Sequence, residues 1–152
     1  MNLSGVNLIM NDERQALSWK KQSGYMISSD GLFFFDEKPA AIPLYEAFAK
    51  RILAEIDNVT VKVQKTQISF SNKYYFAFVS LLPVRKAKER PETWITVTFG
   101  LRYKKESPRI DVASEPYPNR WTHHMLISSV DEIDDELMGW IKEAAAFSTG
   151  KR

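Results

Sequence analysis

Apolar and polar residues alternate most regularly between residues 61 and 101, where the chain reads VKVQKTQISFSNKYYFAFVSLLPV, then a basic loop, then WITVTFGL. A period of two is typical of β-strands, because successive side chains point to opposite faces of a sheet. Within this stretch we predict strands at 66–70, 74–82 and 93–101. In the middle strand both the odd and the even positions are apolar, which predicts a central strand covered on both faces.

Two more strands are predicted towards the C-terminus, at 110–113 and 121–128, which makes an antiparallel sheet of about five strands. The segment 59–63 fits either a strand of its own or the lead into the next strand. The apolar run LFFF at 32–35 fits either an edge strand or a segment that anchors the core. In the middle strand, strict alternation predicts two opposite sets of side chains: Tyr74, Phe76 and Phe78 against Tyr75, Ala77 and Val79.

Helical spacing replaces strand spacing on both sides of this region. Apolar residues recur every three or four positions between 41 and 56, and Pro43 fits the first turn of a helix there. A second amphipathic helix is predicted at 130–147, opened by a capping box from Ser129 to Glu132. Residues 12–22 suit a short third helix with acids early and lysines late. Helices packed on an antiparallel sheet make an α+β fold.

Length and composition bound the class of protein. With 152 residues, 44% of them hydrophobic and 26% charged, we expect a single domain over 1–152. The absence of cysteine excludes disulfides, thiolate nucleophiles and Cys-ligated metal centres. No apolar run reaches the roughly 18 residues of a membrane span, and the start of the chain does not read as a signal peptide, so the expected location is the cytoplasm. The sequence leaves the oligomeric state undetermined.

Charge is unevenly distributed although the net charge is only +2. From Lys62 to His124 there are 12 Lys and Arg residues against 5 Asp and Glu residues, while both flanking segments are mildly acidic. A basic face on the predicted sheet favours anionic partners, including nucleic acid. A set of solvated loop lysines is the simpler explanation of the same pattern.

Four segments occur in order along the chain: LYEAFAKRIL from Leu44, KTQISFSNKYYFAFVSLLP from Lys65, RWTHHMLISSVDEIDDEL from Arg120 and WIKEAAAFS from Trp140. Over residues 38–149 the chain thereby resembles an uncharacterised bacterial domain family, domain of unknown function 5655. The Arg-x-x-His-His strand running into an acidic helix start is the most specific part of the resemblance. It implies a compact α+β domain without an established activity, and it leaves residues 1–30 as an N-terminal extension.

The clearest candidate chemistry lies in the adjacent His123 and His124. Neighbouring side chains on a strand point to opposite faces, so the two imidazoles do not chelate one metal, and we predict no metal site and no cofactor. We expect one histidine inside the fold and the other outside or in a cleft. Together with Arg120 and Lys65, the cleft-facing histidine forms the candidate ligand-binding set, in which positive groups hold an anion. A hydrogen-bonded structural histidine is the alternative.

Further cations and aromatic residues are interleaved at the predicted strand ends and loops: Lys73, Arg85, Arg102, Arg109, Tyr74, Tyr75, Trp94 and Trp121. Basic groups combined with stacking aromatic rings are typical of proteins that hold single-stranded nucleic acid. The alternative is that the aromatic rings belong to the core and the cations to solvent.

Several catalytic signatures are absent. The glycine-rich nucleotide motifs, the serine-hydrolase elbow and the HExxH zinc motif do not occur. Asp111 and Glu115 lack the following Glu-x-Lys that a metal-dependent nuclease needs. The acidic run at 131–136 is expected to complement the dipole of the last helix.

Three functions remain open at this point. The favoured hypothesis is a small binding domain that meets an anionic ligand or nucleic acid on a basic sheet face. The second is an uncharacterised enzyme with a small pocket around Arg120, His123 or His124, and Lys65, so that whether the chain is an enzyme stays undecided. The third is a protein-interaction domain with an exposed aromatic patch.

Overall fold

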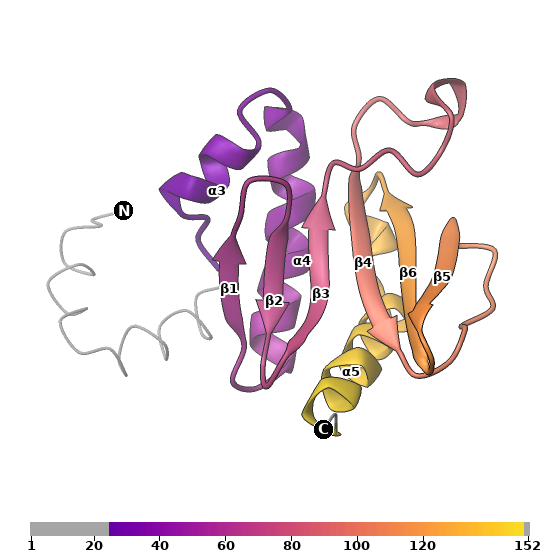
Figure 1. The fold of residues 1–152 in the computed structure, drawn as a ribbon. Coiled ribbons are helices and arrows are strands. Elements are labelled where there is room, and N and C mark those ends of the chain that lie inside the picture. The colour runs from indigo at the N-terminus through magenta and orange to yellow at the C-terminus, as the bar shows by residue number, and fades with distance from the viewer. Residues whose placement is uncertain (1–24, 151–152) are drawn as a thin grey trace, which may run out of the picture.

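One antiparallel sheet organises the part of the chain that the computed structural model describes, residues 25–150; the helix predicted at 12–22 lies outside these residues (Figure 1). Its strands stand in the order β1-β2-β3-β4-β6-β5. Their bounds are β1 Thr60–Val63, β2 Ile68–Ser71, β3 Tyr75–Ser80, β4 Ile95–Leu101, β5 Val112–Tyr117 and β6 Arg120–Ile127. The predicted α+β class is confirmed. The sheet has six strands where about five were predicted, because the segment 59–63 does form a strand, β1.

The strand order follows from the hairpins. β1, β2, β3 and β4 pair in sequence, and β6 then pairs with β4 and leaves β5 at the edge. β5 contains Pro116, which has no N–H to donate and therefore suits an edge strand. Asn119 in the turn between β5 and β6 has a φ of 60°, a left-handed conformation that asparagine tolerates.

Helices α4, Ile42–Glu55, and α5, Asp135–Gly150, cover one face of the sheet (Figure 1). The residues that they bury include members of the two predicted apolar stripes: Tyr45, Phe48, Ile52, Leu137, Ile141 and Ala144. The capping box at Ser129 and Glu132 is present, but it caps the N-terminus of the short 3-10 turn η3, Val130–Glu132. The helix α5 begins only at Asp135, after this turn. No helix within residues 25–150 is long and apolar enough to span a membrane.

The run LFFF belongs to a short helix, α3, Ser29–Phe34, so the edge-strand alternative is wrong. The Ser28 hydroxyl caps this helix by accepting a hydrogen bond from the Gly31 N–H at 3.1 Å. Phe35 follows the helix and is wholly buried in the core, which confirms the anchor alternative. A 3-10 turn, η1, Pro39–Ala41, then leads into α4.

A β-bulge in β3 changes which side chains share a face. The register with β2 shifts by one residue, so that Phe76 is the extra residue between the pairs Ala77–Phe70 and Tyr75–Ser71. Phe76 is therefore 2% exposed in the core, while Tyr75 is 43% exposed with its ring 5.9 Å from the ring of Phe78. The strict alternation predicted for this strand is wrong at these two positions.

Candidate functional site

The four residues predicted as a ligand-binding set do not come together. Lys65 follows β1 and Arg120 begins β6, and because these strands run in the same direction the two residues lie at opposite ends of the sheet (Figure 1). His123 and His124 are neighbours on β6 and face opposite sides of it. Each residue must therefore be examined in its own surroundings.

His123 lies on the helix side of the sheet and is 0% exposed. Its imidazole stacks on the ring of Phe99, with centroids 4.9 Å apart. Its Nε2 accepts a hydrogen bond from the Lys105 N–H at 2.9 Å, which leaves Nδ1 to donate to the Phe99 carbonyl at 3.4 Å. Burial lowers the pKa of this imidazole. Both ring nitrogens are engaged within the fold, so this histidine is the inner one of the pair.

His124 lies on the other side of the sheet, directly opposite Thr98 on β4. Its Nδ1 and the Thr98 hydroxyl share a hydrogen bond of 2.8 Å. The side chain is half-buried, and burial lowers its pKa. This histidine faces the same side of β6 as Thr122 and Arg120, at alternating positions.

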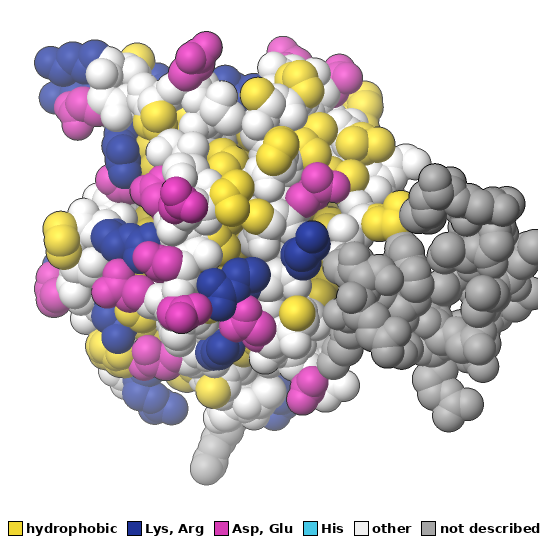
Figure 2. Space-filling model, turned by 180° about the vertical axis from the view of Figure 1, so that it is seen from behind, with side chains coloured by type: hydrophobic (Ala, Val, Ile, Leu, Met, Phe, Trp, Pro, Cys, Tyr) yellow, Lys and Arg dark blue, Asp and Glu magenta, His cyan; other side chains and the backbone are white. Residues whose placement is uncertain are grey.

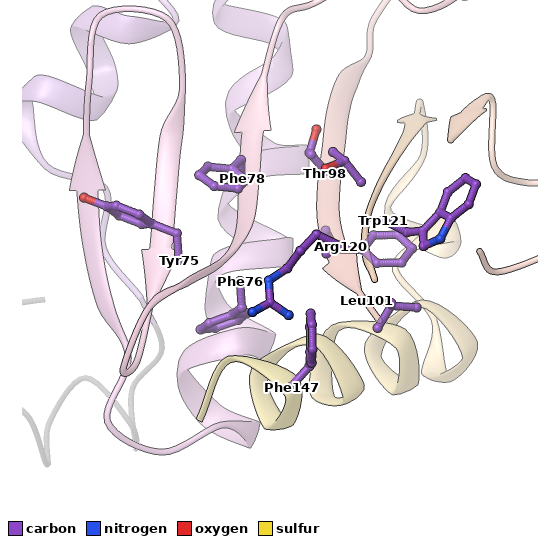
Figure 3. Close-up of a pocket in the computed structure, with 11 residues that line it drawn as sticks. Tyr75, Phe76, Phe78, Thr98, Leu101, Arg120, Trp121 and Phe147 are labelled. Carbon is purple, nitrogen blue, oxygen red and sulfur yellow. The ribbon is translucent and has the colours of Figure 1, made fainter. Parts of the chain in front are cut away.

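A cavity of about 180 Å³ opens where the paired part of β3 and β4 ends. Residues from β3, β4, β6 and α5 line it: Tyr75, Phe76, Phe78, Thr98, Phe99, Gly100, Leu101, Arg120, Trp121, Thr122 and Phe147. Figure 3 shows the Arg120 side chain crossing β4 towards β3, above Phe147 of α5, whereas the Trp121 ring points away from Phe147. Of the four aromatic residues singled out from the sequence, Tyr75 and Trp121 line this cavity, and Tyr74 and Trp94 do not.

Two guanidinium groups converge on the ring of Phe147. The Arg120 Cζ lies 5.1 Å from the ring centroid, and the Arg102 Cζ lies 5.3 Å from it. A second hollow of about 350 Å³, lined by Arg102, Tyr103 and Glu143, adjoins the first at Phe147 and Leu101. Within residues 25–150, neither arginine of this pair has a carboxylate within ion-pair distance. We call Arg102 and Arg120 the arginine pair.

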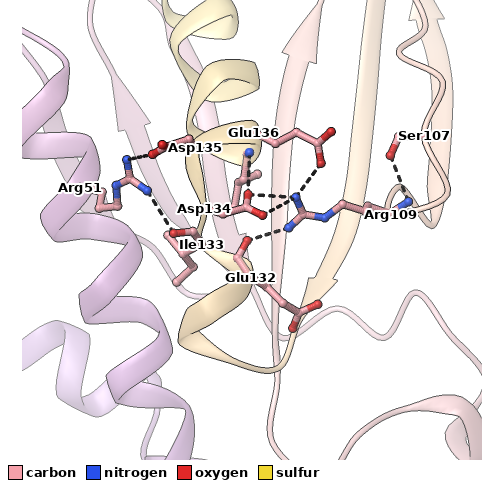
Figure 4. Close-up of polar contacts among 9 residues, drawn as sticks. Arg51, Ser107, Arg109, Glu132, Ile133, Asp134, Asp135 and Glu136 are labelled. Carbon is pink, nitrogen blue, oxygen red and sulfur yellow. Dashed lines mark hydrogen bonds and ion pairs between the residues drawn. The ribbon is translucent and has the colours of Figure 1, made fainter.

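Two other arginines of the basic segment, Arg85 and Arg109, are already neutralised. Arg90 has no carboxylate partner within residues 25–150, and it lies over the Trp94 ring together with Lys38. Arg85 pairs with Asp111 at 2.8 Å. Arg109 pairs with Asp134 at 2.9 Å and with Glu136 at 2.8 Å, and its guanidinium also donates to the Glu132 carbonyl (Figure 4). The contacts of Arg109 connect the loop between β4 and β5 to the start of α5.

The acidic start of α5 also forms contacts with α4. Arg51 of that helix pairs with Asp135 at 2.9 Å and donates to the Ile133 carbonyl at 3.1 Å (Figure 4). The acidic run therefore has a structural role as the partner of two arginines, in addition to its place at a helix N-terminus. Seen from the helix side, positive and negative side chains are intermixed, which argues against this face as the anion-binding surface (Figure 2).

Lys65 borders a different and larger hollow of about 820 Å³, between α3 and the ends of β1 and β3. Three carboxylates line this hollow together with Lys38 and Lys65: Asp30, Asp36 and Glu37. Acids outnumber bases there, so these surroundings suit an anion less well than those of the arginine pair.

Sequence reasoning included Arg102 only as one of several scattered cations and did not single out Phe147. The signal for Phe147 was its position, since it continues the apolar stripe of the last helix beyond Ala144 at a spacing of three. Within the described part of the chain, no group of three or more His, Asp or Glu side chains is placed to hold a metal ion.

Comparison with known proteins assigns the fold to a family without assigning a function. The profile of a family described as a domain of unknown function (DUF5655) matches residues 33–148, which is most of the chain. No curated protein and no solved structure matches the chain significantly. The resemblance seen in the sequence is thereby confirmed, and the chain belongs to the DUF5655 family.

Proposed function

We propose that this protein is a small cytoplasmic binding domain for an anionic ligand or nucleic acid, and that the arginine pair around Phe147 holds the anion. The observation that carries the proposal is the contrast among the arginines. Arg85 and Arg109 have carboxylate partners, whereas Arg102 and Arg120 have none within residues 25–150 and meet at one ring. Arg90 has none either, but it shares the Trp94 ring with Lys38, and Trp94 does not line the cavity beside Arg120. Arginine binds phosphate and carboxylate groups in a bidentate manner, and an aromatic face supports its planar guanidinium.

Two anionic probes test this proposal: inorganic tripolyphosphate in calorimetry, and a short single-stranded thymidine oligonucleotide in fluorescence anisotropy. We expect both to bind, and the affinity to fall as salt rises because bound counterions are released. Arg120→Gln and Arg102→Gln should each weaken binding about tenfold, since a charge-assisted hydrogen bond contributes roughly 1.5–3 kcal/mol.

Lys65→Gln is the matched control, because it removes one positive charge at the opposite end of the sheet. Its effect should stay within about twofold if a local site is responsible. If Lys65→Gln weakens binding as much as Arg120→Gln, the attraction is diffuse and the proposed site is refuted.

One observation favours the enzyme alternative. Thr98 is one of the residues that line the cavity, and its hydroxyl lies 2.8 Å from His124 Nδ1, which is the distance at which an imidazole activates a nucleophile. The same hydrogen bond is expected between two polar residues directly opposite each other on paired strands. Hydrolysis of p-nitrophenyl phosphate or acetate that is lost in both Thr98→Val and His124→Gln would support catalysis, and background rates in all three proteins would contradict it.

The protein-interaction alternative has weaker support. Among residues 25–150, the two most exposed aromatic side chains are Phe33, 78% exposed on α3, and Tyr117, 70% exposed at the end of β5. They lie at opposite edges of the sheet, since α3 contacts β1. They therefore do not form one patch, and a monodisperse monomer in sedimentation at high protein concentration would contradict this alternative.

A further inference from the structure

We infer that the ligand of the arginine pair carries a flat ring beside its anionic group, and that mononucleotides are the class of ligand that fits. This inference rests on the proposed function and adds to it the chemistry of the uncharged part of the ligand. The evidence for the ring is the shape and the lining of the cavity next to Arg120, and it does not depend on the charge of that arginine.

The cavity exists because two neighbouring backbone positions place no side chain in it. β3 and β4 pair as far as Ala77 and Phe99, and the bulge at Phe76 turns that side chain into the core. On β4 the next position is Gly100, where an added Cβ would find the nearest heavy atom, the Trp121 carbonyl oxygen, 3.8 Å away. Any other residue at this position would extend a side chain from the face of β4 that Thr98 also occupies.

The size of the cavity suits a single ring. Its volume is about 180 Å³, and a cavity of roughly 150 Å³ in a protein core is known to accept a benzene ring. A bare phosphate would leave most of this space to water against apolar walls. A ring would displace that water and bury the apolar surface, which is favourable.

The lining offers contacts for both the faces and the edge of a ring. Phe78, in ring contact with Tyr75, stands on the β3 side, and the Arg120 side chain extends from β6 across β4 so that its flat guanidinium lies between β3 and β4 (Figure 3). Aromatic rings and guanidinium planes are the surfaces on which nucleobases stack. Thr122 also lines the cavity, and its hydroxyl makes no hydrogen bond to residues 25–150, so we expect it to be available to a heteroatom of the ring.

The anionic group would be held at the rim while the ring is inside. Arg120 lines the cavity and also approaches Phe147, whose other hollow contains Arg102. A ligand with its phosphate close to its ring can therefore reach the arginine pair without leaving the cavity. Mononucleotides combine these two parts, either free or as units of a single strand.

The test compares uridine 5′-monophosphate, ribose 5-phosphate and a short uridine oligonucleotide in calorimetric titrations of the full chain. Uridine monophosphate should bind about tenfold more tightly than ribose 5-phosphate, because stacking of one base contributes roughly 1–3 kcal/mol. Gly100→Leu should fill the cavity and abolish this difference, while the affinity for ribose 5-phosphate stays within about twofold. Gly139→Leu is the matched control on the exposed surface of α5, where an added Cβ would have no neighbour within 4 Å.

Gly100→Val is the second variant if the leucine variant does not fold, and a β-branched residue at a glycine position of a strand is expected to support the strand. Equal affinities for uridine monophosphate and ribose 5-phosphate in the wild-type protein would overturn the ring inference while leaving the anion site intact. Failure of all three probes to bind would overturn the proposed function itself. Tighter binding of the oligonucleotide than of the monophosphate, with the same loss in Gly100→Leu, would support the ring and assign its source to a single strand.

Discussion

The imidazole of His123 lies parallel to the ring of Phe99, with 8° between the two planes and 4.9 Å between their centroids. The same imidazole accepts a hydrogen bond from the Lys105 N–H, so it joins β6 to β4 and to the loop that follows β4. A neutral ring is required for this bond, because only an unprotonated Nε2 can accept. His123 therefore has a structural role, whereas His124 lies on the opposite face of the sheet, where it bonds to Thr98.

The stability of the protein should fall in acid because of His123. Burial lowers the pKa of this imidazole in the folded state, so the unfolded chain binds the proton more tightly, with its pKa near 6.5. The stabilisation is complete above about pH 6.5 and is lost as the pH falls towards and through the folded pKa. Urea unfolding followed from pH 7.5 down to about pH 5 should show this decline in the wild-type protein.

His123→Phe provides the comparison for the pH experiment, since it preserves a ring against Phe99. It should cost about 1–3 kcal/mol at neutral pH, because the Lys105 N–H loses its acceptor. Its stability should then decline less steeply in acid than that of the wild type. Some decline remains because burial also lowers the pKa of His124. Equal declines in both proteins would contradict the role given to His123.

Arg109→Gln should destabilise the fold by about 1–3 kcal/mol. The guanidinium bonds to Asp134, Glu136 and a backbone carbonyl and lies 5.7 Å from the Trp140 ring, so its loss detaches the loop between β4 and β5 from α5. Lys104→Gln is the control, because its pairing with Glu106 at 3.7 Å is exposed and should change stability by less than about 0.5 kcal/mol. Thermal unfolding measures both, and equal effects would refute the special position of Arg109.

Ser148→Ala should destabilise the protein although the change is small. The buried Ser148 hydroxyl accepts from the Tyr74 N–H at 2.9 Å and donates to the Tyr74 carbonyl at 3.0 Å, so it satisfies both backbone groups of that residue. Without it the Tyr74 N–H is left unpaired, at a cost of about 1–3 kcal/mol, whereas the Tyr74 carbonyl still accepts from the Asn72 N–H at 3.1 Å. Thr149→Ala removes an exposed hydroxyl from the next position and should change little. Chemical denaturation of the two variants should therefore separate them clearly.

The bulge in β3 makes neighbouring phenylalanines unequal. Phe76→Ala should cost about 3–5 kcal/mol because it opens a void in the core. Phe78→Ala should cost clearly less, since that ring is only half-buried at the edge of the cavity. Strict alternation would predict similar costs for two residues on one face. Similar costs in denaturant unfolding would therefore argue against the bulge.

Local patterns in the sequence were sufficient for most of the fold. The three-to-four spacing predicted α4 within one residue at each end, and the period of two predicted β4 and β6, because side-chain burial on a helix or strand follows its own repeat. The strand predicted at 110–113 lies instead at Val112–Tyr117 and continues through Pro116, which an edge strand tolerates because its outer N–H positions need no partner. The extra residue at Phe76 escaped detection, since a bulge depends on the partner strand.

The candidate site was decided by tertiary structure. The sequence supplied Arg120 and Arg102 as cations, but ion pairing between segments far apart in the chain determines which arginines stay unneutralised. The same holds for the histidines: alternation predicted that His123 and His124 face opposite sides, and only the position of α5 decided which side is the interior. Burial and charge pairing are sums over neighbours brought together by folding, so a pattern along the chain determines the elements, and their packing determines the site.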